Sequence, residues 1–353
     1  MTRAPSSTVY DYDFMDQIGV GSYGCVYRAK HKVTNSMVAV KVMKKKGRKS
    51  SENNHWQEYK TMKRLSNHPN IVRLYEGFTG PTKELYFVME FMNGGNLYQY
   101  LKEQRVSRKI PTESQVRHIL RQILDALASM HDQGYFHRDL KPENLLVETN
   151  QEHPTQLTIK LADFGLAREL KSKAPYTDYV STRWYRSPEV LLKASVYSSP
   201  VDIWAVGVIM AELYTLFPLF PGQSEIDQLY RICEILGSPG TNIISRKKNK
   251  IRSNGFSRKK SDISLYSSTN MATTSTGILN ERTCTLGEGG EWKEGAKLAQ
   301  KIGFQFPQVE PKGLSSVLPK ASNLMIDLLR RLLLFEPEKR LCARDALCHP
   351  FFI

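Results

Sequence analysis

The stretch HRDLKPEN occupies residues 137–144, and it decides the fold. Three of its polar side chains, Asp139, Lys141 and Asn144, lie at short spacing. A carboxylate can accept a proton from a hydroxyl group, an ammonium group can neutralise charge on a phosphoryl group, and an amide oxygen suits Mg²⁺. A His-Asp loop is common by chance, but these eight residues in this order are not. We therefore predict catalytic roles for Asp139 and Lys141 and a metal-binding role for Asn144.

A second acidic turn, Asp163-Phe164-Gly165, follows an apolar run that is predicted to form a strand, Thr158–Ala162. Seen alone, such a turn is most often just a bend in the chain. Beside Asn144, however, the Asp163 carboxylate would complete a set of oxygen ligands for Mg²⁺. Ser187-Pro188-Glu189 follows further along the chain.

Towards the N-terminus, GVGSYGCV at residues 19–26 places Gly19, Gly21 and Gly24 in a turn. Glycine lets the backbone approach a phosphate without a Cβ clash. The pattern alone is weak evidence, because it also opens the first helix of dinucleotide-binding folds. Here Cys25–Lys30 is predicted to be a strand, which favours a loop that covers the phosphates of ATP.

Lys41 lies in the β-branched, alternating run Met37–Met43, which is predicted to be a strand. A lysine on a strand usually faces solvent. Glu58 lies on the helix predicted next, at residues 52–65, and a pair between the two side chains would hold Lys41 against the phosphates of ATP.

The patterning changes at Gly94-Gly95. Short strands come before it, and long helical patterns come after it. We therefore predict an α+β chain of two lobes, with a β-rich lobe at residues 14–92 and a mainly helical lobe at 93–353. The other predicted elements are strands at Phe14–Val20 and Leu85–Phe91 and helices at Glu113–Asp132, Val201–Leu216, Asp227–Leu236 and Ala321–Leu334.

Residues from about 240 to 291 interrupt this pattern, because they are basic, then rich in Ser and Thr, then rich in Gly. They lack the apolar density of a folded segment, so we predict a disordered insertion. Its basic run, Arg246–Lys260, would dock acidic partners, serve as a nuclear signal or be an inert loop.

The chain of 353 residues has a formal net charge of +15, which is compatible with nucleic-acid binding. No aromatic residues interleave closely with the basic ones, which argues against nucleic acid as the main partner. Five scattered cysteines favour a reducing compartment without a metal cage. Residues 1–10 contain no apolar run, and Asp202 and Glu212 interrupt Val201–Leu219, so we expect no secretory signal and no membrane partner.

Taken together, these motifs resemble the eukaryotic protein kinases over about Phe14–Phe352. The resemblance implies a serine/threonine kinase that uses ATP and Mg²⁺ and acts on protein substrates. It assigns the metal to Asn144 and Asp163. It implies ATP contacts at Ile18, Gly19, Gly21, Gly24, Val26, Lys41, Glu58, Glu90 and Met92, with Met89 as gatekeeper. It also implies a stacked spine of Met62, Leu74, His137 and Phe164, a buried pair of Glu189 and Arg340, and a central helix that starts near Asp202 and Trp204.

The loop TDYVSTRWYRSPE at residues 177–189 is similar to the CMGC group, and it is most similar to the RCK subfamily. That subfamily includes male germ cell-associated kinase, intestinal cell kinase and a yeast meiosis-inducing kinase. The similarity implies activation by phosphorylation of Thr177 and Tyr179, although both could be plain loop residues. Phosphates need arginine partners. We assign Arg138 and Arg168 to Thr177, and Arg183 and Arg186 to Tyr179.

The same resemblance implies a proline-directed substrate pocket at Arg186, an upstream activating kinase and a monomer. It points to the cytoplasm, the nucleus, or a cilium or flagellum, and to meiosis or control of cilium length. Three other classes of protein compete with this interpretation: a scaffold with the same fold, a phosphotransferase for small molecules, and a basic nucleic-acid-binding protein. The complete catalytic set argues against the scaffold, and the peptide-binding segment that ends at Ser187-Pro188-Glu189 argues against small-molecule substrates.

Overall fold

A computed structural model gives the structure of the chain, and it describes residues 8–20, 24–43, 49–149, 152, 156–170, 183–239 and 287–353. The described residues belong to one compact body, which lies within residues 1–240 and 287–353. Thr177, Tyr179 and Gly21 lie outside the described residues, as does the basic run Arg246–Lys260.

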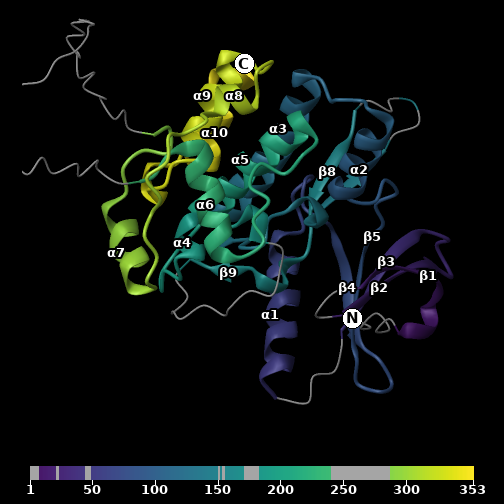
Figure 1. Cartoon of the computed structure of the whole chain (residues 1–353). Helices are drawn as coiled ribbons and strands as arrows, with labels where there is room; N and C mark the ends of the chain where they lie inside the picture. The colour runs from purple at the N-terminus through teal and green to yellow at the C-terminus, as the bar shows by residue number, and fades with distance from the viewer. Residues whose placement is uncertain are drawn as a thin grey trace, which may run out of the picture. The chain divides into compact units, whose positions relative to one another are not determined.

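The N-terminal lobe is an antiparallel sheet of five strands in the order β1-β2-β3-β5-β4, with helix α1 beside it (Figure 1). Alternation along β3 places Val38 and Val40 in a small cluster on one face of the sheet. Lys41 therefore points to the other face. The elements are β1 (Tyr12–Val20), β2 (Gly24–His31), β3 (Met37–Met43), α1 (Lys49–Leu65), β4 (Leu74–Thr79) and β5 (Leu85–Glu90).

The C-terminal lobe is built around α5 (Pro200–Thr215), which is buried along nearly its whole length from Val201 to Leu213. Helix α3 (Glu113–Asp132) packs against it with an apolar face (Figure 1). Thr112 and Gln115 cap the start of α3 reciprocally. The other helices are α2 (Leu97–Ser107), α4 (Pro188–Leu191), α6 (Glu225–Leu236), α7 (Lys293–Lys301), α8 (Leu314–Val317), α9 (Asn323–Leu332) and α10 (Ala343–Leu347).

Short elements between α3 and α4 carry the motif residues. Two small sheets pair β6 (Tyr135–Phe136) with β9 (Arg168–Glu169) and β7 (Leu145–Glu148) with β8 (Thr158–Leu161). The 3-10 helices are η1 (Val9–Asp11), η2 (Pro142–Asn144), η3 (Phe164–Leu166), η4 (Arg183–Tyr185), η5 (Pro337–Lys339) and η6 (Pro350–Phe352).

The structure confirms the α+β fold with two lobes. The helix predicted at Glu113–Asp132 is confirmed at both ends, and the glycine turn is followed by strand β2, as predicted. Sequence patterning missed β4 and α2, which each bury few side chains. The apolar run that starts at Val201 is a core helix, and no helix in the described part of the chain is both long and apolar enough to cross a membrane.

The end of the predicted insertion needs a correction. We placed it near Glu291, but the structure describes the chain again from Gly287. The Glu288 carboxylate accepts the Leu314 N–H at 2.6 Å and pairs with Arg330 at 2.6 Å. Because of these contacts, Gly287–Glu291 belongs to the folded body rather than to a disordered segment.

Candidate active site

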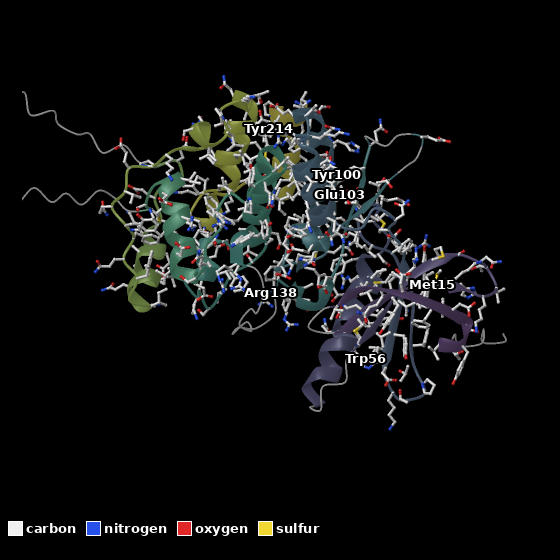
Figure 2. All side chains as sticks on the ribbon, turned by 45° about the vertical axis from the view of Figure 1, so that its right-hand side comes forward. Met15, Trp56, Tyr100, Glu103, Arg138 and Tyr214 are labelled. Atoms are coloured by element: carbon white, nitrogen blue, oxygen red, sulfur yellow. The ribbon has the colours of Figure 1, made fainter. Side chains whose placement is uncertain are left out.

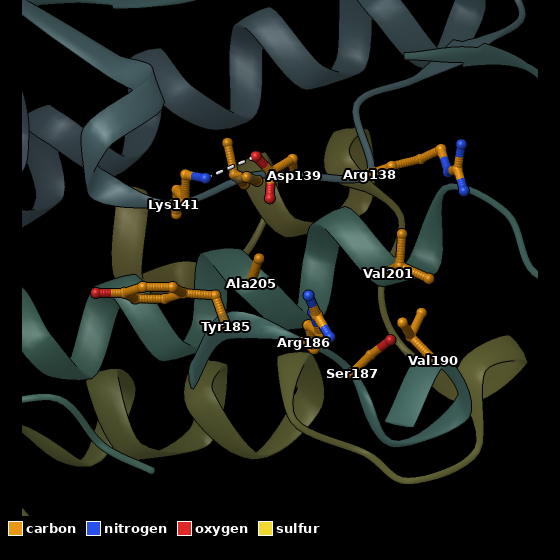
Figure 3. A pocket seen from close by; sticks show the side chains of 10 residues that line it. Arg138, Asp139, Lys141, Tyr185, Arg186, Ser187, Val190, Val201 and Ala205 are labelled. Carbon is orange, nitrogen blue, oxygen red and sulfur yellow. Dashed lines mark hydrogen bonds and ion pairs between the residues drawn. The ribbon is translucent and has the colours of Figure 1, made fainter. Parts of the chain in front are cut away.

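The loop between β6 and β7 carries the predicted catalytic residues. Lys141 Nζ lies 2.7 Å from Asp139 Oδ2 (Figure 3). The amide nitrogen of Asn144 donates to the Asp139 backbone carbonyl at 2.8 Å and to Oδ2 at 3.2 Å. The carboxylate of Asp139 is thereby held from two sides, with its direction fixed relative to the loop.

Asp202, at the start of α5, fixes the backbone of this loop. Its two carboxylate oxygens accept the N–H groups of His137 at 2.8 Å and Arg138 at 2.9 Å. His131 Nε2 lies 2.9 Å from Oδ2. Burial alone would raise the pKa of Asp202, but the contacts with His131 and the loop outweigh it and hold the pKa below its ordinary value. Arg138 adopts a φ of 74°, a left-handed conformation that needs this support.

Lys41 joins the two lobes through two carboxylates. Its Nζ lies 2.6 Å from Glu58 Oε1 of α1 and 3.1 Å from Asp163 Oδ1, just before η3. Burial opposes the charge on Lys41, but Asp163 and Glu58 outweigh it and raise the pKa of the ammonium group. Lys41 holds the pKa of Asp163 below its usual range, whereas burial raises the pKa of Glu58 against the pull of Lys41. The predicted contact between Lys41 and Glu58 is thus present, and Asp163 contacts the same ammonium group.

The four residues predicted to stack as a spine are all buried. The rings of His137 and Phe164 meet edge to face at 5.6 Å between centroids. His137 Nε2 also lies 2.9 Å from the Ala162 carbonyl oxygen. Met62, Leu74 and Phe164 belong to one apolar cluster, so α1, β4 and the Asp163 turn pack together.

The residues assigned to ATP line the opposing strands of the N-terminal lobe and the segment after β5. Gly19 pairs with Val26 across β1 and β2. A Cβ on Gly24 would lie 2.3 Å from the Val42 carbonyl oxygen, so only glycine fits there. Ile18 is partly exposed on β1. These positions are compatible with a loop that lies over a nucleotide.

Glu90 and Met92, the residues assigned to the adenine-binding hinge, differ from each other in their hydrogen bonding. The Glu90 side chain is occupied by Lys160 at 2.6 Å and by the Arg73 N–H at 2.6 Å. Among the described residues, neither backbone group of Met92 makes a hydrogen bond. The Glu90 side chain joins β5 to β8 through its contact with Lys160.

Of the four arginines assigned to phosphates, Arg168 lies on β9 and Arg183 on η4, whereas Arg138 and Arg186 lie between named elements. Arg138 donates to the Tyr197 hydroxyl, and Arg168 lies on β9, whose register pairs it with Phe136. Arg183 donates to the Gln223 carbonyl at 3.0 Å. Arg186 lies 3.5 Å from Glu225 at the start of α6, and the other oxygen of Glu225 lies 3.6 Å from Lys193.

Several polar contacts near the catalytic loop were not predicted. The Tyr185 hydroxyl donates to buried Glu212 of α5 at 2.7 Å, and burial raises the pKa of both groups. Two buried oxygens, Ser187 Oγ and Glu143 Oε2, have no hydrogen-bond partner within the described ranges. A small cavity brings Ser187 together with Arg138, Asp139, Leu140, Lys141, Tyr185, Arg186, Val190, Val201 and Ala205 (Figure 3).

The predicted pair in the large lobe is present. Both guanidinium nitrogens of Arg340 contact Glu189, at 2.6 and 2.8 Å. The guanidinium group also donates to three backbone carbonyls and lies over the Trp204 ring. This contact ties the end of the activation segment to the core.

The available donors fit Mg²⁺. Asp163 is the more exposed carboxylate beside Lys41, and the amide nitrogen of Asn144 faces Asp139, so its oxygen faces away from that residue. In the ranges that the structure describes, no group of three His, Cys, Asp or Glu side chains could hold a metal by itself. Mg²⁺ is usually held by only one or two carboxylates together with phosphate oxygens, so a sparse donor set suits it.

A family profile described as "Protein kinase domain" matches residues 12–352. The chain is 43% identical to the human serine/threonine-protein kinase MAK over 341 residues, which cover 97% of this chain and 45% of that protein. It is 42% identical to the mouse serine/threonine-protein kinase ICK, with 97% and 45% coverage. It is also 42% identical to cyclin-dependent kinase F-3 of rice, with 97% and 65% coverage. The chain thus spans about half the length of the two animal relatives.

Proposed function

The chain belongs to the protein kinase family, and on that premise we propose that the protein transfers the γ-phosphoryl group of ATP to Ser or Thr of protein substrates. The observation that carries this proposal is the pair of contacts at Lys41. They bring together a strand, a helix and a turn that are far apart in sequence, at 2.6 and 3.1 Å. The same turn lies beside the loop that holds Asp139 and Lys141.

Each residue then has a distinct role. The glycine turn and Lys41 orient the phosphates, and Asp139 takes the proton of the attacking hydroxyl group. The hydroxyl oxygen bonds to the γ-phosphorus while the bond between that phosphorus and the oxygen of ADP breaks. Lys141 steadies the transferred group. Asp163 and Asn144 would hold Mg²⁺, which neutralises phosphate charge when it is bound.

We propose that phosphorylation of Thr177 and Tyr179 activates the kinase, with an upstream kinase acting on Thr177. The arginines support this proposal, because Arg183 begins η4 and Arg186 directly follows it, a few residues after Tyr179 in the sequence. A phosphate on Tyr179 would compete with Glu225 for Arg186, which lies 3.5 Å from that carboxylate. Arg186 should favour the phosphate, because a phosphate carries nearly two negative charges and a carboxylate carries one.

We further propose a substrate with proline after the target residue and a basic residue before it. Arg186 lines the cavity beside the catalytic loop and supports the first preference. Glu143, which directly precedes Asn144, has a buried oxygen without a partner in the described part of the chain and supports the second. An unpaired buried carboxylate oxygen gains most from a cationic partner.

The similarity of the activation segment to the RCK subfamily supports the remaining proposals. We propose a monomer that works in the cytoplasm, the nucleus, or a cilium or flagellum, in meiosis or in control of cilium length. The basic insertion would dock an acidic partner or act as a nuclear signal.

The deciding experiment is phosphate transfer to a peptide library with Ser or Thr fixed at its centre, with the wild-type chain and Asp163→Asn compared. We expect the wild-type chain to prefer proline directly after the target and Asp163→Asn to lose at least about 10² in turnover, because one of the two residues that would hold Mg²⁺ is missing. Wild-type protein that binds Mg·ATP without any transfer, even with the activation loop phosphorylated, would favour a scaffold instead.

A further inference from the structure

Two pieces of chain from different lobes run side by side where the lobes meet. Residues 70–73 lead into β4 of the N-terminal lobe, the lobe labelled at Met15 in Figure 2, and Leu161 ends β8 of the C-terminal lobe. Val72 donates its N–H to the Leu161 carbonyl at 2.9 Å, and Leu161 donates its own N–H to the Asn70 carbonyl at 2.8 Å. The lobes are therefore joined by backbone hydrogen bonds as well as by the covalent connection after β5.

Two amide side chains support this junction from the side. Asn70, which is buried, donates from its amide nitrogen to the Ile159 carbonyl and to the Gln122 amide oxygen, each at 2.9 Å. The same Gln122 oxygen accepts the Ile159 N–H at 2.9 Å, and the Gln122 amide nitrogen donates to the Leu157 carbonyl at 2.9 Å. Gln122 lies on α3, so these contacts tie the junction to the core of the C-terminal lobe. Satisfied polar contacts of this kind rigidify the segments that they join.

An ion pair completes the junction at the end of β5. Lys160 Nζ of β8 lies 2.6 Å from Oε2 of Glu90, the last residue of β5. The other carboxylate oxygen, Oε1, accepts the Arg73 N–H at 2.6 Å. Both side chains of the ion pair are largely shielded from water, with 16% of Lys160 and 15% of Glu90 exposed. One carboxylate thus connects β5, the segment before β4 and β8, and it fixes the direction in which the chain leaves the N-terminal lobe.

Strand β8 leads directly to a residue that contacts the N-terminal lobe again. Asp163 lies three positions after Lys160, and its Oδ1 is 3.1 Å from Lys41 Nζ of β3. The ion pair between Lys160 and Glu90 is therefore present in the same arrangement of the lobes as the contact between Lys41 and Asp163. An ion pair that held the lobes in an unproductive arrangement would not be expected together with that contact.

We propose that Lys160 is a positioning residue, which acts through Glu90 to hold the lobes in the arrangement in which Lys41 meets Asp163 and a nucleotide fits between them. This inference rests on the proposed function, in which both of those residues act at the phosphates of ATP. Without the ion pair, a smaller fraction of the molecules has this arrangement at any time. The apparent Kd for a nucleotide rises by the inverse of that fraction.

The test uses the full chain and measures the Kd of Mg·ADP by calorimetry, together with kcat and the KM values for ATP and for a peptide substrate. Lys160→Met keeps most of the side-chain volume but removes the charge. We expect the Kd of Mg·ADP and the KM for ATP to rise about three- to tenfold, an effect between those of an exposed ion pair and of a shielded hydrogen bond to a charged group. The KM for the peptide should not change. Lys160→Gln is the second variant if Lys160→Met does not fold.

Three further variants separate positioning from a general loss of structure. Lys160→Arg keeps the charge, and its Kd should stay within about twofold of the wild-type value. In a Glu90→Gln background, Lys160→Met should change the Kd no further, because Lys160 acts through Glu90. Lys297→Met breaks an exposed ion pair with Glu294, 3.1 Å long, and it is the control.

The outcomes distinguish this inference from the proposed function. Wild-type protein that binds no Mg·ADP would overturn both. Wild-type protein that binds Mg·ADP with the same Kd as Lys160→Met would overturn only this inference, and a lower Tm without a change in Kd would assign Lys160 to stability alone. Tighter binding or a higher kcat in Lys160→Met would also overturn it, because the ion pair would then restrain the lobes. A further rise in Kd in the Glu90→Gln background would show that Lys160 does not act through Glu90.

Discussion

Two contacts between a carboxylate and a cation have the same length but very different surroundings. Glu58 Oε1 lies 2.6 Å from Lys41 Nζ in the N-terminal lobe, and Glu189 Oε1 lies 2.6 Å from Arg340 Nη1 in the C-terminal lobe. Lys41 has a second carboxylate partner, Asp163, whose side chain is 42% exposed. The Arg340 side chain has no exposed surface, and backbone carbonyls take up its other donors.

The difference shows what each contact can do. At the first contact, Glu58 and Asp163 share the ammonium group of Lys41, and Asp163 comes from the other lobe. A ligand can therefore rearrange this contact at small cost. In the buried contact, Glu189 and three backbone carbonyls satisfy the donors of Arg340, so the contact cannot be rearranged without leaving a buried charge unpaired. We expect the first contact to matter for turnover and the second for stability. Matched Glu→Gln substitutions separate the two effects.

The largest effect is expected from Glu189→Gln. The substitution keeps the side-chain volume but leaves the Arg340 guanidinium group buried without a counter-charge, which should lower the free energy of unfolding by about 3–5 kcal/mol. Urea denaturation of the full chain measures it, with Glu338→Gln, an exposed glutamate on η5, as the control. A loss below about 1 kcal/mol would show that the amide satisfies Arg340 as well as the carboxylate does.

A smaller effect, on turnover rather than on stability, is expected from Glu58→Gln. Asp163 still neutralises Lys41, and burial no longer has to be overcome at Glu58, so the free energy of unfolding should change by less than about 1 kcal/mol. The charge that aims Lys41 is lost, and kcat/KM should fall about 10- to 100-fold, or about 1.4–2.7 kcal/mol. Steady-state kinetics with a peptide substrate give the number. The comparison of the two regions would fail if Glu58→Gln cost as much stability as Glu189→Gln.

Local patterns predicted most of the fold, and they failed where an element buries few residues. Apolar spacing and a reciprocal cap predicted α3 at both ends. Helix α2 was missed because only Leu97 and Leu101 are buried on it, and β4 was missed because only Leu74 is buried on that strand. The end of the insertion was misplaced, because glycine-rich composition predicted disorder where the Glu288 contacts hold the chain.

For the site, too, local patterns predicted some of the residues and missed others. Motifs of fixed spacing predicted Asp139, Asn144 and the pairing of Lys41 with Glu58. They gave no hint that Tyr197 would reach Arg138 or that Tyr185 would reach Glu212, because these contacts join distant segments of the chain without a shared local pattern. Asp202 was predicted only to mark the start of a helix, and the structure shows that its carboxylate fixes the backbone of the catalytic loop.

The smallest effect is expected from a change of pH on the stability of the chain, and it tests the contact between Lys41 and Asp163. Lys41 lowers the pKa of Asp163 below its ordinary value. The unfolded chain therefore binds a proton at Asp163 at a higher pH than the folded chain does. The stabilisation from ionised Asp163 should be complete above the unfolded pKa of about 4, and it should be lost as the pH falls through the lower, folded pKa.

The Tm of the wild-type chain should thus exceed that of Asp163→Asn near neutral pH, and the gap should close as the pH falls below about 4. Thermal unfolding of both proteins between about pH 3 and 7 measures it. Asp13→Asn is a matched control, since the contact between Asp13 and Lys32 is exposed, with the two groups 3.5 Å apart, and such surface pairs contribute little. Burial raises the pKa of Glu58, so that carboxylate acts with the opposite sign and lowers stability as the pH rises. A gap that does not change with pH would mean that Lys41 is held mainly by Glu58, and a gap that widens on acidification would mean that burial raises the pKa of Asp163.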